Sequence, residues 1–249
     1  MWPLFFYYIC TMIDSVRNTV LSIISKDNRG YITPMEFNLF AKQAQMEIFE
    51  GLIYKYSNAV NNQNGRNYNA GYADIPKKIS EAIEVFSIYD SLSFDAINLR
   101  FSIPSNCFYL DKVLYNNIIE IEKVSHSKIH NLLMSNTAAP TTSYPVYTMD
   151  GFGITIYPSI LNSAAQSGFI TSQYLRYPLD PNWTYTSLSN GDPVFNPSVS
   201  AGYQDFELPL SYETDLVLKI LQYSGVSIRE IEVVQAAKSE EVQNIQEKG

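Results

Sequence analysis

The spacing of apolar residues changes twice along this chain, and these changes limit the folds that it can adopt. Up to about residue 90, and again from about residue 211, apolar side chains recur every three or four positions, as in amphipathic helices. Between them, short β-branched and aromatic runs are separated by Pro, Asn, Gly and Asp, which is typical of strands and turns. The sequence therefore predicts an α+β fold, with N-terminal and C-terminal helices forming a bundle and a central antiparallel β-rich domain.

These changes divide the chain into three parts. We assign residues 12–92 together with 211–249 to the helical bundle, and residues 93–210 to the β-rich domain. Residues 1–11 are either an apolar arm or an upstream extension ahead of a start at Met12. The run MWPLFFYYIC is too short to span a bilayer. It also lacks the basic region and the small-residue cleavage site of a secretory signal.

Three helices are expected before the β-rich domain. The first covers residues 13–26, and the third covers residues 75–89. The second begins at the sequence TPME, in which Thr33 is the expected N-cap and Glu36 its reciprocal partner in a capping box. We expect this helix to end near Asn58, where a loop rich in Asn and Gly begins.

The β-rich domain contains six strand candidates, and two helices are expected after it. Asp150-Gly151 predicts a hairpin between two of the strands. The first C-terminal helix is expected to end at Gly225, and Ser227 to Glu230 form a second capping box that opens the terminal helix. The strand candidates are INLRFSI, CFYLDKVLY, IIEIEKV, YPVYTM, FGITIYP and GFITSQYLRYP.

The segment SKDNRGYITPMEF resembles the second half of a calcium-binding EF-hand loop, but its ligand positions do not fit calcium. Aligning Gly30 and Glu36 with the loop places Ser25 at position 1 and Arg29 at position 5. Calcium requires oxygen ligands, and position 1 is normally Asp. We therefore interpret the segment as a connector that ends one helix and starts the next.

No other motif predicts catalysis or cofactor binding. His126 and His130 are four residues apart and could share a helical face, but no glutamate follows the first histidine as in a zinc protease. There is no G-x-S-x-G motif and no phosphate-binding loop. Cys10 and Cys107 give neither a disulfide framework nor metal-ligand spacing. The expectation is no catalytic residue, no metal and no cofactor.

The composition favours protein contacts over nucleic-acid binding. The net charge is −8, whereas affinity for phosphates comes from Lys and Arg. Nineteen tyrosines suggest half-buried surface, because the ring is apolar and the hydroxyl needs a polar partner. Between Ile129 and Leu210 the only basic residue is Arg176. Such a charge-poor surface suits packing against protein.

Three segments resemble virion structural proteins of crAss-like and related Bacteroides phages, and specifically the head-to-tail connector, or ring, proteins of short-tailed phages. They are GYITPMEFNLFAKQAQMEIFEG, YLRYPLDPNWTY and FELPLSYETDLVLKILQYSGVSIREIEVVQAA. The resemblance covers most of residues 12–240 and is absent from MWPLFFYYIC, in keeping with an extended start. It contains no catalytic signature.

The resemblance implies a dodecameric ring beneath the portal, in which the terminal helix reaches the neighbouring subunit or the portal. DNA would pass through the ring without specific binding, and acidic side chains facing the channel would repel its phosphates. The implied partners are copies of this chain, portal and tail proteins, and double-stranded DNA in passage, with no membrane. The candidate interface residues are Ile228, Ile231, Val234, Val242, Ile245, Tyr174, Arg176, Tyr177 and Trp183.

These expectations describe a non-enzymatic connector subunit located in the virion after assembly in the host bacterial cytoplasm. A first alternative is a tail or decoration protein that binds a glycan through its Tyr- and Trp-rich β domain. A second is a tail-associated hydrolase. Assembly into a ring or binding to portal would separate the connector from both alternatives.

Overall fold

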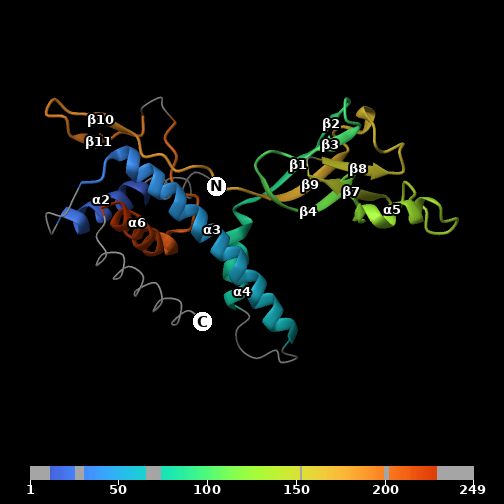
Figure 1. Ribbon diagram of the computed structural model, residues 1–249, viewed down its shortest axis with the longest axis horizontal. Helices are drawn as coiled ribbons and strands as arrows, with labels where there is room; N and C mark the ends of the chain where they lie inside the picture. Colours follow the sequence, from blue (N-terminus) through green and yellow to red (C-terminus); the bar gives the residue numbers. More distant parts are fainter. Residues whose placement is uncertain (1–11, 26–30, 66–73, 152, 199–201, 229–249) are drawn as a thin grey trace, which may run out of the picture. The chain divides into compact units, whose positions relative to one another are not determined.

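The computed structural model describes residues 12–25, 31–65, 74–151, 153–198 and 202–228. Their fold is α+β, with five α-helices and mostly antiparallel sheets (Figure 1). The chain forms two compact units: Phe86–Tyr177 make one, and Met1–Val85 with Pro178–Gly249 make the other. We call them the β unit and the helical unit and describe each by itself. None of the described helices combines the length and apolarity that a bilayer crossing needs.

The helical unit begins with α2 (Met12–Ser25) and α3 (Pro34–Gly65), both predicted from the sequence. The capping box at the start of α3 is confirmed. Thr33 donates its backbone N–H to Glu36 Oε2 at 2.9 Å, and Glu36 donates its own to Thr33 Oγ1 at 3.3 Å. Glu36 therefore has a structural role in this helix cap. Residues 26–30 of the EF-hand-like segment lie outside the described residues.

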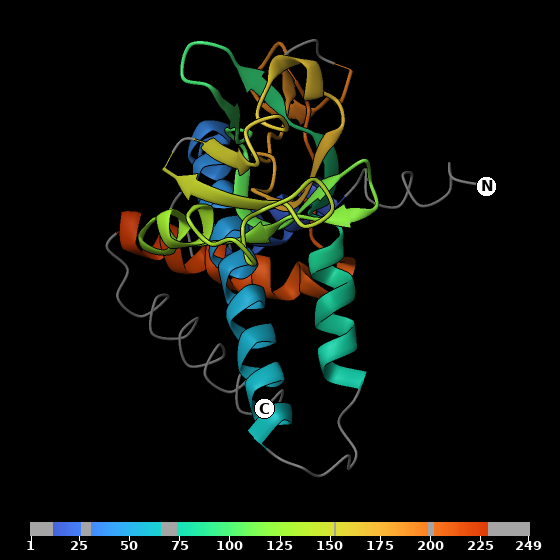
Figure 2. The same cartoon turned by 90° about the vertical axis from the view of Figure 1, so that its right-hand side faces the viewer.

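Two helix boundaries differ from the prediction. The end near Asn58 was wrong, because α3 continues to Gly65 through the first residues of the expected Asn-rich loop. The third helix, α4 (Asp74–Glu84), ends before Tyr89, and Ser87–Ser91 form strand β1 instead. Here pairing with a neighbouring strand overrides the helical spacing of the apolar residues. Figures 1 and 2 both show α4 lying alongside the second half of α3.

The last described helix, α6 (Glu213–Ile228), packs against α2 and α3. Its predicted apolar face is confirmed, since Leu216, Val217, Ile220 and Leu221 are all buried. The predicted end at Gly225 was wrong, because the helix continues to Ile228. Ser227 is consequently inside α6 and is not an N-cap, whereas Glu230 and the predicted terminal helix beyond Ile228 lie outside the described residues.

A tertiary hydrogen-bond network closes the start of α2. Asp205 accepts N–H groups from Met12 at 3.1 Å, Ile13 at 2.9 Å and Phe206 at 2.8 Å. Two of these donors belong to the first turn of α2, whose N–H groups lack partners within the helix. The Asp205 carboxylate, 193 positions from Met12 in the sequence, thus takes the role that an N-cap side chain usually has. Burial raises the pKa of Asp205, and the backbone hydrogen bonds oppose that rise.

Residues 178–210 belong to the helical unit, although the sequence placed them in the β-rich domain. Lys42 and Gln45 on α3 bind Asp180 and the Leu179 carbonyl oxygen, each at 2.7 Å. The segment continues into a ribbon of two antiparallel strands, β10 (Tyr185–Ser187) and β11 (Pro193–Phe195). The division therefore falls at 85/86 and 177/178 rather than at 92/93 and 210/211. The reason is tertiary contact with α3, which strand propensity does not reveal.

The β unit contains two sheets. One has the strand order β1-β9-β4-β5 and the other β2-β3-β8-β7-β6, with all pairs antiparallel except β6–β7. The predicted hairpin at Asp150-Gly151 is confirmed, because Asp150 on β7 pairs with Gly153 on β8. The remaining strands are β2 (Ser93–Asp95), β3 (Arg100–Ser102), β4 (Cys107–Tyr115), β5 (Ile119–Glu120), β6 (Glu122–Lys123), β7 (Val146–Asp150), β8 (Gly153–Tyr157) and β9 (Ile170–Arg176).

Both sheets contribute side chains to one apolar core. Val113 and Ile170 come from the four-stranded sheet, and Phe101, Ile154 and Ile156 come from the five-stranded sheet. Phe94 also meets Phe101 edge-to-face, with 5.1 Å between the ring centroids. This core fixes the strands whose connecting loops carry the exposed residues described next.

Candidate interaction site

Three exposed apolar residues lie on two adjoining loops of the β unit. Ile97 and Leu99 are in the turn between β2 and β3, and Ile160 is in the loop after β8. Ile97 is 91% exposed, and the other two side chains are also mostly exposed. We call these three residues the loop tip. Single exposed apolar residues are ordinary, but a group of them on a fixed support indicates a contact surface.

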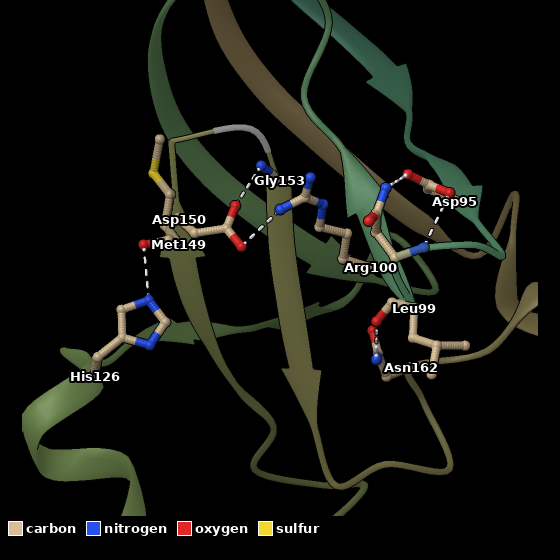
Figure 3. Close-up of polar contacts among 9 residues, drawn as sticks. Asp95, Leu99, Arg100, His126, Met149, Asp150, Gly153 and Asn162 are labelled. Atoms are coloured by element: carbon tan, nitrogen blue, oxygen red, sulfur yellow. Dashed lines mark hydrogen bonds and ion pairs between the residues drawn. The ribbon is translucent and has the colours of Figure 1, made fainter.

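The turn that carries Ile97 is held by Asp95. One carboxylate oxygen of Asp95 accepts the backbone N–H groups of Ile97 at 2.9 Å and Asn98 at 3.2 Å. The other accepts the Asn98 side-chain amide at 2.6 Å (Figure 3). These hydrogen bonds lower the pKa of Asp95, and the hydrogen bond from the Asn98 side chain has the largest effect. The turn therefore stays closed with its carboxylate ionised at neutral pH.

The second loop is attached to the first by Asn162. Its side-chain amide donates to the Leu99 carbonyl oxygen at 2.7 Å (Figure 3). Its side-chain oxygen accepts the Ile156 N–H at 3.4 Å. Leu99 has a φ of 51°, in the left-handed region that a branched side chain rarely adopts. The Asn162 hydrogen bond holds the carbonyl oxygen of this unusual residue in place. Both loops thus present their apolar side chains from a common base.

An ion pair connects the base of this turn to the β7–β8 hairpin. Arg100 donates to Asp150 Oδ2 at 2.8 Å, and Asp150 Oδ1 accepts the Gly153 N–H at 2.9 Å (Figure 3). The Arg100 stem crosses Gly153 so closely that a Cβ there would lie 2.8 Å from Arg100 Cδ and 2.7 Å from the Phe101 carbonyl oxygen. A side chain at this position would therefore collide with the Phe101 backbone and displace the Arg100 stem.

The two histidines lie on α5 (His126–Leu133), as their spacing allowed, and both are exposed. His126 Nε2 lies 3.2 Å from the Met149 carbonyl oxygen (Figure 3). Within the described ranges, no three His, Cys, Asp or Glu side chains are close enough together to hold a metal ion. Cys107 is half-buried, and burial raises the pKa of its thiol.

Three of the predicted interface residues lie at or just after the end of β9. Tyr174 is buried, and its hydroxyl donates to Asn106 at 3.5 Å. Arg176 is half-buried, donates to the Tyr177 carbonyl oxygen at 3.0 Å and faces the Phe86 ring at 5.9 Å. Tyr177 is partly exposed and stacks edge-on against Phe108. Of the three, only Tyr177 presents a substantial surface in the single chain.

Trp183, the fourth predicted interface residue, is a core residue of the helical unit and only 2% exposed. Its indole N–H donates to Asp14 at 2.9 Å, and its backbone N–H donates to Asn38 at 2.9 Å. The Arg17 guanidinium lies 3.7 Å from the ring centroid, and Tyr185 stacks on the ring. Trp183 therefore joins α2, α3 and the β10–β11 ribbon and presents almost no surface in the single chain, so that its predicted interface role stays a prediction.

The other predicted interface residues cannot be placed. Ile228 ends α6, and its side chain is not described. The four beyond it, Ile231, Val234, Val242 and Ile245, lie outside the described residues. The loop tip was not predicted, although the run DAINLR contained a signal: an Asp that can hold a turn, followed by apolar residues where a turn is normally polar.

The comparisons with known proteins do not assign this chain to a family. Neither the protein-family models nor the curated proteins gave a match.

Proposed function

We propose that this chain is a non-enzymatic structural subunit of the head-to-tail connector ring of a tailed phage. In this proposal its N- and C-terminal helices form the bundle of the subunit, and twelve copies assemble beneath the portal in the virion. The observation that carries the proposal is the loop tip, where Asp95 and Asn162 hold apolar side chains outward. A preorganised apolar tip loses little conformational entropy when it is buried by a partner, which favours a protein contact.

The charge of the chain supports the same role. With a net charge of −8, the protein has little tendency to bind phosphates, and DNA in the channel would slide past it. The resemblance of three segments to connector proteins agrees with this role. If the loop tip of each subunit contacts a different surface of its neighbour, the interface is heterologous. Such an interface forms a closed ring when a whole number of equal rotations between neighbours completes a full turn.

The proposal is tested by placing charges in the loop tip. The double variant Ile97→Asp, Ile160→Asp should fold normally, because both side chains are exposed, but should no longer assemble with portal or enter virions. Lys128→Asp, an exposed change on α5 of the same unit, is the matched control and should assemble. Native mass spectrometry of the chain coexpressed with portal measures assembly. Normal ring formation by the double variant would show that the tip is not the contact.

A further inference from the structure

Helix α3 carries apolar side chains on two opposite faces. Phe37, Ala41 and Ala44 are buried in the helical unit. On the other side, Met35 and Leu39 lie one turn apart, and Met46 lies about two turns further along the same side of the helix, with Lys42 and its ion pair to Asp180 between Leu39 and Met46. Met35 is 76% and Leu39 60% exposed, and Met46 is half-buried. We call these three residues the outer stripe.

Residues 1–11 form a segment whose composition favours burial against an apolar surface. Residues 1–11 have no charged side chain, and five of them are aromatic. Burying an aromatic or large aliphatic side chain stabilises a protein by about 1.5–3 kcal/mol relative to leaving it in water. Unlike the polar C-terminal segment after Ile228, this run has no hydrophilic face of its own. It therefore gains more from covering an apolar surface.

The described contacts place the origin of this segment near the outer stripe. Asp14, in the first turn of α2, binds the indole N–H of Trp183, and Asn38, next to Leu39, binds the backbone N–H of the same residue. Trp183 thus contacts both α2 and α3 close to the start of each helix. Eleven residues span up to roughly 36 Å when extended. Met46 lies only about 10 Å along the helix from Leu39.

We propose that residues 1–11 lie along the outer stripe of the same chain and cover Met35, Leu39 and Met46. Thioether sulfurs make favourable contacts with aromatic rings, which suits a methionine-rich stripe facing five aromatic residues. Attachment at Met12 gives the segment an effective concentration in the millimolar range, well above that of a second copy in dilute solution. This inference concerns the free chain and does not depend on the connector role.

Protection of an engineered thiol tests the proposal on the full-length chain. Cys10→Ser and Cys107→Ser remove the native thiols, and Leu39→Cys places one on the stripe. Maleimide should label this thiol about tenfold more slowly than it labels the same thiol in a protein that also carries Phe5→Asp and Phe6→Asp. A tenfold difference corresponds to about 1.4 kcal/mol of docking free energy. Ile97→Cys in the β unit is the control and should label equally fast in both backgrounds.

Three results would overturn the proposal. Equal labelling of Leu39→Cys in both backgrounds would mean that residues 1–11 do not cover the stripe. Protection that is lost with Val242→Asp and Ile245→Asp, but kept with the Phe5 and Phe6 changes, would identify the C-terminal segment as the occupant. Protection that disappears on dilution would identify a second copy. Circular dichroism of each variant confirms that the fold is retained.

Discussion

Replacing Asp205 with alanine should destabilise the helical unit more than any change to a surface carboxylate. Asp205 is 5% exposed and accepts three backbone N–H groups, two of them from the first turn of α2. A hydrogen bond to a charged group contributes about 1.5–3 kcal/mol, so three would contribute roughly 5–9 kcal/mol if they added. The burial of the carboxylate, which also raises its pKa, offsets part of that sum.

We therefore expect Asp205→Ala to lower the free energy of unfolding by about 3 kcal/mol, within the range for leaving buried groups without a partner. Urea denaturation followed by circular dichroism at the helical band measures the loss, because four of the five described helices lie in this unit. Glu50→Ala, an exposed carboxylate on α3, is the control and should change stability by less than about 0.5 kcal/mol. A loss below about 1 kcal/mol for Asp205→Ala would refute the assignment of Asp205 as the N-cap of α2.

Four further measurements test other parts of the structure. Gly153→Ala should destabilise the β unit by about 1–3 kcal/mol, because the added Cβ would meet the Phe101 carbonyl oxygen and the Arg100 stem. A Cβ at Gly151 has open space, so Gly151→Ala should cost less, and thermal melts of the two variants measure the difference. Thr33→Ala should cost about 0.5–2 kcal/mol in the same assay, through loss of the α3 cap, and an unchanged melting temperature would contradict this. Burial and the hydrogen bond to Glu47 raise the pKa of Tyr223 to about 12. Its folded pKa thus exceeds the unfolded value of about 10, so its stabilising contribution is present below pH 10 and is lost as pH rises through about 12. Tyr223→Phe should abolish that part of the alkaline loss, measured as unfolding free energy against pH. Finally, deleting the residues after Ala237 should leave a folded monomer but weaken its entry into the connector; failure to fold or normal incorporation would each oppose this.

Local signals predicted much of the secondary structure. The capping box at Thr33 and the hairpin at Asp150-Gly151 depend on residues close in sequence, and both formed as expected. Strand β4 (Cys107–Tyr115) coincides with its predicted run, because aromatic and β-branched residues suit a half-buried strand.

Tertiary contacts account for the main errors. The sequence could not show that Asp205 would cap a helix beginning at Met12, because the two residues are 193 positions apart. It also could not show that residues 178–210 pack on α3 through Lys42 and Gln45. Trp183 illustrates the same limit: its aromatic character fits an interface and a core equally, and contacts with both α2 and α3 bury it.

The loop tip was missed for a related reason. Ile97 and Ile160 are more than sixty residues apart, and each alone is an unremarkable exposed isoleucine. The pairing of β3 with β8 and the hydrogen bond from Asn162 to Leu99 bring their loops together.

We propose that this chain is a connector subunit of a tailed phage, and single-particle electron microscopy of virions tests this proposal. If the proposal is right, we expect density for both units of this chain in a ring of twelve copies between portal and tail, surrounding the DNA channel. Density for the chain on the capsid surface or in a tail fibre, or no density for it in the virion, would contradict the account.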